Sequence, residues 1–276
     1  MWGVENLPDL LLFSQERRYF ADHSTRRKQM TKLSRRGFLG SLAGSSAGFL
    51  TAVTLPKAAF AADQAPQKWD QTVDLLVVGA GGAGLASAVS AAQHGVKNIV
   101  VLEKMPFFGG NTSISGGGFN SVDPVRQGKQ KIKDSPELHA RQTIAGGDGR
   151  ANPELVKTMT ANSYDAIKWL QDMGMKFKDD VYQIYGGLYP RCHAPYGSLG
   201  SDYIKVLKPQ CDKEGINILT NSRVVRIFRE NQLSGKVLGV EYVDKDGQHK
   251  TVKAQKAVIV ATGGFGANPE MRAKYD

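Results

Sequence analysis

Cysteine is scarce in this chain, which contains only Cys192 and Cys211 in 276 residues. The two form neither a C-x-x-C nor a C-x-x-C-H motif, which excludes covalent c-type haem and any cysteine-based zinc or iron–sulfur site on this chain. A single disulfide in an oxidising compartment and two unpaired, partly buried thiols are equally good expectations. The five histidines show no metal-ligand spacing, so we expect no metal site.

The chain also lacks an apolar run long enough for a permanent membrane span. The Gly- and Ala-rich stretch 41–55 is shorter than the roughly 18–20 residues that a span requires. Half of the net charge of +10 lies in residues 1–61, and no run of Lys and Arg interleaved with aromatics follows. We therefore expect no nucleic-acid binding. A composition of 41% hydrophobic and 22% charged residues is typical of a soluble globular protein.

The N-terminal region has the three parts of a secretory signal. Residues 30–61 contain a basic segment with Arg35-Arg36, the apolar stretch 41–55 and an A-x-A sequence ending at Ala61. The Arg pair predicts a twin-arginine signal peptide, cleavage after Ala61 and a periplasmic bacterial protein. A signal of normal proportions starts at Met30, so we interpret residues 1–29 as a mis-called extension. Residues 62–72 form a linker.

A dinucleotide-binding βαβ unit is predicted between Val73 and Glu103. The apolar run 73–78 is typical of a buried parallel strand and leads into G-x-G-x-x-G at residues 79–84. An Ala-rich helix over 85–94 ends at Gly95, and a second strand over 99–102 precedes Glu103.

Each residue of this motif has an expected mechanical role. Gly79 allows the tight turn, Gly81 lets the backbone approach a pyrophosphate, and Gly84 lets the helix pack closely on the strand. The pyrophosphate is expected at the helix N-terminus, beside Ala83, because unpaired N–H groups there favour anions. Glu103, about 20 residues past the motif, is expected to accept hydrogen bonds from the adenosine ribose.

The next segment indicates which dinucleotide is bound. Residues 104–120 read K-M-P-F-F-G-G-N-T-S-I-S-G-G-G-F-N, a loop whose many small residues imply close backbone approach to a ligand. This pattern resembles the soluble fumarate reductase and flavocytochrome c family, in which the loop wraps the flavin pyrophosphate and ribityl chain. The resemblance implies FAD as the cofactor, with contacts from Lys104, Gly110, Asn111, Thr112, Gly116 and Gly117.

The same resemblance continues to the end of the chain. The strand and turn over 257–264, containing A-T-G-G, are similar to the segment that returns the family's chain to its FAD-binding sheet, with Ala261 and Gly263 as contacts. Residues 217–229 and a hairpin over 236–253, turned at 244–247, match the family's added β-structure, in which Val224 would contact the adenine. We expect an α/β, Rossmann-like FAD-binding domain over residues 73–276, with a parallel sheet, helices and an added β-hairpin layer.

Asn111 bears on how the flavin is held. In the related membrane-bound succinate dehydrogenases, a histidine at the matching position bonds covalently to the flavin. An amide cannot serve as that nucleophile, so we expect non-covalent FAD.

The middle of the chain carries weaker signals. A helix is predicted over 153–173, capped by Asn152, with an apolar stripe of Leu155, Met159, Ile167 and Leu170. A loop over 185–200 contains Arg191 and His193, which either contact the flavin phosphate or substrate route, or belong to a solvated loop with a buried arginine pair. A helix is predicted over 201–214, with Ser and Asp as capping residues, and we interpret it as a structural element of the domain.

The resemblance implies a reductase that transfers hydride from FAD to the C=C bond of an unsaturated carboxylate such as fumarate, urocanate or an acrylate. With no haem motif here, electrons would come from a separate multihaem cytochrome c or a quinol-linked partner. The family's catalytic side chains lie beyond Asp276, in the capping domain and the returning C-terminal part, so we expect a truncated FAD domain. The alternatives are an inactive FAD-binding fragment and a flavin dehydrogenase of the ketosteroid type.

Overall fold

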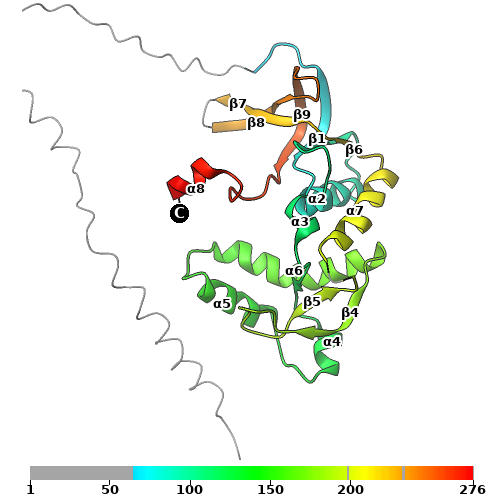
Figure 1. Cartoon of the computed structure of the whole chain (residues 1–276), viewed down its shortest axis with the longest axis vertical. Coiled ribbons are helices and arrows are strands. Elements are labelled where there is room, and N and C mark those ends of the chain that lie inside the picture. The colour runs from blue at the N-terminus through cyan, green and yellow to red at the C-terminus, as the bar shows by residue number, and fades with distance from the viewer. Residues whose placement is uncertain (1–64, 198, 232–233, 276) are drawn as a thin grey trace, which may run out of the picture. The chain divides into compact units, whose positions relative to one another are not determined.

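The computed structural model describes residues 65–197, 199–231 and 234–275 (Figure 1). The predicted N-terminal extension, the predicted twin-arginine signal and residues 62–64 of the predicted linker lie outside the described residues. Among the described helices, none has the length and apolar character that crossing a membrane requires.

A six-stranded mixed sheet forms the centre of the fold, with the strand order β6-β2-β1-β9-β8-β7. The first four strands in this order are parallel, and β8 and β7 extend the sheet by antiparallel pairing. Its strands are β1 (Gln71–Val78), β2 (Ile99–Leu102), β6 (Asn217–Leu219), β7 (Arg223–Asn231), β8 (Ser234–Val243) and β9 (His249–Val260). The predicted parallel sheet with an added hairpin is confirmed.

Alternate residues of β1 and β2 enter two separate hydrophobic clusters, because successive strand residues point to opposite faces of a sheet. Leu75 and Ile99 belong to the cluster covered by α2 (Gly82–Gln93), α6 (Pro153–Asp172) and α7 (Ser201–Lys213). Leu76 and Val100 pack on the other face with residues of β8 and β9. Strands β1 and β2 are thus buried on both sides, as their continuous apolar runs predict.

Strand β9 joins two predicted features that are one element. Its first part pairs with β8 around the turn at 244–247, and it pairs in parallel with β1 from Val252 to Val260. The predicted strand that runs into a glycine turn over 257–264 is present and ends at Val260, but its expected burial is wrong in part, because Ala257 and Val260 are exposed.

A smaller antiparallel sheet has the order β3-β5-β4. Its strands are β3 (Phe119–Asn120), β4 (Phe177–Tyr182) and β5 (Cys192–Pro195). The predicted loop over 185–200 therefore contains a strand, because β5 finds partners on both sides that are distant in sequence. The other helices are α3 (Gly110–Ile114), α4 (Pro124–Lys129), α5 (Pro136–Gly146) and α8 (Pro269–Tyr275).

Helix α6 begins as predicted, with the Asn152 side chain accepting hydrogen bonds from two first-turn N–H groups. The predicted apolar stripe is wrong at its N-terminal half, where Leu155 and Met159 are exposed. Val156, Thr160 and Ser163 face inward instead. The two hydroxyls donate to carbonyls of their own helix, which allows these small polar residues to be buried.

Helix α7 differs from its prediction at the cap. Gly200 is the N-cap and supplies no side chain, while the Asp202 carboxylate accepts a hydrogen bond from the Gly197 N–H. Cys211, in α7, and Cys192, in β5, are both buried and unpaired. The structure thus favours the second of the two expectations for the thiols.

Candidate functional site

The N-terminus of α2 is an open set of hydrogen-bond donors. The helix begins after Gly81, an N-cap residue that has no side chain to cap the first turn. The Gly82 N–H donates to the Thr112 hydroxyl at 3.1 Å. The first-turn N–H groups of Ala83 and Gly84 have no intrahelical acceptor and carry the positive end of the helix dipole, so this end can bind an anionic group.

At two positions of the G-x-G-x-x-G motif, only glycine fits because there is no space for a side chain. A Cβ atom on Gly84 would overlap the carbonyl oxygen of Gly79, and one on Gly79 would overlap the carbonyl oxygen of Ala261. Gly79 also has a φ of +104°, in the left-handed region. The first turn of α2 therefore rests directly on the ends of β1 and β9.

A second glycine turn lies against the first. Gly109 and Gly110 have φ angles of +109° and +50°, and the Gly109 N–H donates to the carbonyl of Ala80 at 2.7 Å. A Cβ on Gly110 would lie 3.4 Å from the Cα of Gly81. The two turns form a floor of bare backbone, which we call the glycine cradle: residues 79–84 and 109–112.

Glu103 is buried beside this cradle, with 7% of its surface exposed. One carboxylate oxygen accepts a hydrogen bond from the Ala80 N–H at 2.8 Å, and the other accepts one from the Met105 N–H at 2.9 Å. A carboxylate has about four acceptor positions, so capacity remains for ligand hydroxyls. Glu103 thus ties the first glycine turn to the end of β2.

The other predicted contact residues fall into two groups. Val224 is brought near the cradle because the Ser222 N–H donates to the Glu103 carbonyl at 2.7 Å, and Ala261 lies against Gly79. Lys104, Gly116 and Gly263 are exposed on loops, and Asn111 is exposed on α3 within the cradle.

A cavity of about 370 Å³ opens beside the first turn of α2. Three predicted contact residues line it: Ala83, Thr112 and Gly117. The remaining lining comes from α2, α6, α7, β3 and the loop before β3, and its large side chains, such as Trp169, Leu207 and Phe119, are apolar or aromatic. The cradle therefore continues into a space suited to the apolar part of a ligand.

The sequence analysis did not identify two residues that support α3 and the loop after it, Gly200 and Tyr203. A Cβ on Gly200 would overlap the carbonyl oxygen of Thr112, and the Tyr203 hydroxyl donates to the Gly117 carbonyl at 2.8 Å. The only local feature of the sequence that could have pointed to these contacts is the position of Gly200 directly before a helix. The residues that they contact, Thr112 and Gly117, lie more than 80 residues earlier in the chain.

Arg191 does not line the cavity. Its guanidinium makes a bidentate ion pair with Asp134, at 2.8 and 2.7 Å, and donates to the Gln142 side chain at 2.7 Å. The Arg191 and Asp134 side chains are 5% and 0% exposed. Burial alone would raise the pKa of Asp134, but hydrogen bonds from Arg191 and Gln127 outweigh it and hold the pKa below its usual value.

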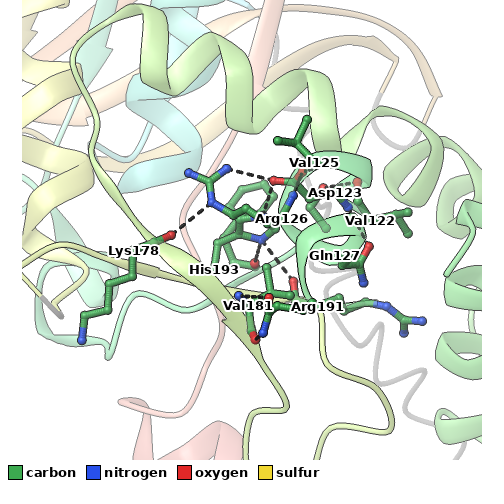
Figure 2. A network of polar contacts seen from close by, with 12 residues as sticks. Val122, Asp123, Val125, Arg126, Gln127, Lys178, Val181, Arg191 and His193 are labelled. Atoms are coloured by element: carbon green, nitrogen blue, oxygen red, sulfur yellow. Dashed lines mark hydrogen bonds and ion pairs between the residues drawn. The ribbon is translucent and has the colours of Figure 1, made fainter. Parts of the chain in front are cut away.

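His193 is likewise a buried structural residue (Figure 2). Its Nε2 lies 3.0 Å from the Asp123 carboxylate, and its Nδ1 lies 3.2 and 3.1 Å from the carbonyl oxygens of Phe119 and Arg191. These contacts hold the imidazole ring between the start of α4 and the strands of the smaller sheet. Asp123 also accepts from Arg126 and caps α4. The structure supports the reading of a buried pair over a role for Arg191 or His193 at the ligand.

No three His, Cys, Asp or Glu side chains among the described residues gather as a metal site.

Comparison with known proteins places this geometry in a family. The FAD binding domain family matches residues 74–275. The chain is 37% identical to the fumarate reductase (cytochrome) of Shewanella frigidimarina over 74% of this chain and 35% of that protein. It is 38% identical to the urocanate reductase of Eggerthella lenta over 84% of this chain and 40% of that protein.

A solved structure shows the same architecture. The open conformation of a flavocytochrome c3 fumarate reductase superposes with a TM-score of 0.69 and 33% identity, over 75% of this chain and 36% of that one. The chain spans less than half the length of each of these proteins. On its sequence match and its fold, it belongs to the FAD binding domain family and is homologous to fumarate reductase-type flavoproteins.

Proposed function

We propose that this chain holds FAD non-covalently in the glycine cradle. The observation that carries the proposal is the uncapped N-terminus of α2 lying against the second glycine turn, at Gly81 and Gly109. The cradle fits a pyrophosphate because its glycines leave backbone donors open to close approach, and a Cβ on Gly82 would collide with the Thr112 side chain.

Each part of the cradle then has a role. The N–H groups of Ala83 and Gly84 bind the pyrophosphate, and Glu103 accepts hydrogen bonds from the adenosine ribose. Val224 contacts the adenine through its backbone. The loop residues Gly116 and Gly117 border the ribityl chain.

Asn111 leads to a prediction about flavin attachment. The residue is exposed on α3, where its side chain can reach a ligand but cannot form a flavin bond. Acid precipitation of the FAD-loaded protein should release all of the yellow flavin into the supernatant. Flavin absorbance that remains in the washed pellet would contradict non-covalent binding.

For the reaction, we propose reduction of the C=C bond of an unsaturated carboxylate, with electrons from a cytochrome c or a quinol-linked partner. FAD supplies hydride transfer in such chemistry. The homologous fumarate and urocanate reductases support this class. The residues of this chain bind and orient the cofactor, and no catalytic residue is assigned among them.

The reaction class is tested with the protein expressed from its native gene and loaded with FAD. Oxidation of reduced methyl viologen should depend on fumarate, acrylate or urocanate. A protein that instead passes electrons from a 3-ketosteroid to a dye would belong to the ketosteroid dehydrogenase class, and the proposal would be wrong.

We also propose export by the twin-arginine route, on the motif at Arg35-Arg36. Expressed in a bacterium, the protein should be recovered from the periplasm with Ala62 as its first residue. Changing Arg35-Arg36 to Lys-Lys should retain it in the cytoplasm. An exported protein that still begins at Met1 or Met30 would refute cleavage.

A further inference from the structure

The peptide between Gly117 and Gly118 is held from one side by a single side chain. The Tyr203 hydroxyl donates to the Gly117 carbonyl oxygen at 2.8 Å. Both residues are buried, with Tyr203 only 9% exposed. Burial, with smaller contributions from nearby acidic groups, raises the pKa of Tyr203, which favours the protonated hydroxyl that donates this hydrogen bond.

The backbone around this peptide leaves little freedom. Gly117 has a φ of +72°, and a Cβ there would lie 2.8 Å from backbone atoms of Leu199 and Gly200. The Gly200 N–H donates to the Ser115 carbonyl at 2.8 Å. The loop is therefore packed against the start of α7, which also carries Tyr203.

Fixing the carbonyl of Gly117 also fixes the next N–H. In a planar trans peptide the C=O and N–H point in opposite directions, so the Gly118 N–H points away from the Tyr203 hydroxyl. No acceptor among the described residues pairs with this N–H, and Gly118 is exposed. Gly117, Gly118 and Tyr203 all line the cavity next to the cradle.

We propose that Tyr203 is a positioning residue, which orients the Gly117–Gly118 peptide so that the Gly118 N–H donates to an acceptor atom of the flavin. This inference rests on the proposed binding of FAD. Tyr203 acts through the backbone and need not touch the cofactor itself.

The test is Tyr203→Phe in the full chain, which removes the hydroxyl and keeps the ring that packs edge-on against Phe177. Tyr242→Phe is the matched control, because Tyr242 is also 9% exposed and its hydroxyl makes no hydrogen bond among the described residues. Two readouts are needed: hydrogen exchange of the segment 113–120 without FAD, and FAD affinity with the visible circular dichroism of the bound flavin.

We expect Tyr203→Phe to raise exchange at 113–120 and to weaken FAD binding, each by about 3- to 10-fold, and to change the flavin dichroism. Tyr242→Phe should change none of these. Unchanged exchange in Tyr203→Phe overturns the inference, and so does raised exchange with unaltered affinity and dichroism. A wild-type chain that binds no FAD contradicts the proposed function, whereas raised exchange would still support the anchoring of the loop.

Discussion

Gly84→Ala should weaken FAD binding by about 10- to 100-fold and destabilise the fold by about 1–3 kcal/mol. The added methyl group would overlap the carbonyl oxygen of Gly79, which is backbone and cannot rotate away. To make room, the first turn of α2 must move off the ends of β1 and β9. The donors that face the pyrophosphate move with it. Calorimetric titration with FAD and urea unfolding measure the two effects.

Gly146→Ala is the matched control for this substitution. Gly146 lies in α5, its φ is not left-handed, and a Cβ there would meet no atom within 4 Å. Because alanine favours helix over glycine, the control should leave FAD binding unchanged and stability equal or higher by up to about 1 kcal/mol. If Gly84→Ala and Gly146→Ala changed FAD affinity and stability equally, the close contact at Gly84 would not be the cause of the predicted losses.

Arg191→Met should have the largest effect on stability, a loss of about 3–5 kcal/mol in urea or thermal unfolding. The substitution leaves the fully buried carboxylate of Asp134 without its bidentate partner. Removal of the second charge as well, in the double variant Arg191→Met with Asp134→Asn, should recover part of the loss. No recovery in the double variant would mean that packing, and not the unpaired charge, causes the effect.

The exposed pair Arg150 and Asp148 supplies the control, with its atoms 3.9 Å apart and side chains 76% and 59% exposed. Arg150→Met should change stability by less than about 1 kcal/mol.

The lowered pKa of Asp134 also makes the stability of the fold depend on pH. Its contribution to stability is present above the unfolded pKa of about 3.9 and is lost as pH falls from there through the lower folded pKa.

Local sequence pattern predicts the elements of the cradle because their physical causes are local. The apolar run of β1, the glycine motif and the distance to Glu103 all lie within about 30 residues, and each has a mechanical reason. The turn at 244–247 and the cap at Asn152 are also local, and both are confirmed.

What sequence pattern could not predict depends on contacts between distant segments. Arg191 meets Asp134 from 57 residues away, and Tyr203 meets Gly117 from 86. No spacing rule indicates such pairs, so the sequence left a ligand-binding role open for Arg191 and His193 beside the structural one. The predicted apolar stripe on α6 is wrong in part for a related reason. Burial of Thr160 depends on the hydrogen bond that its hydroxyl donates within the helix and on the neighbouring α5.

Titration of the folded chain with FAD, with FMN as the comparison ligand, tests the central claim most directly. FMN lacks the adenosine that Glu103 and Val224 are proposed to hold. We predict one FAD bound per chain, with FMN binding at least about tenfold weaker, as expected if the ribose hydrogen bonds contribute. A chain that is folded by circular dichroism but binds no FAD, or binds FAD no better than FMN, would contradict the claim.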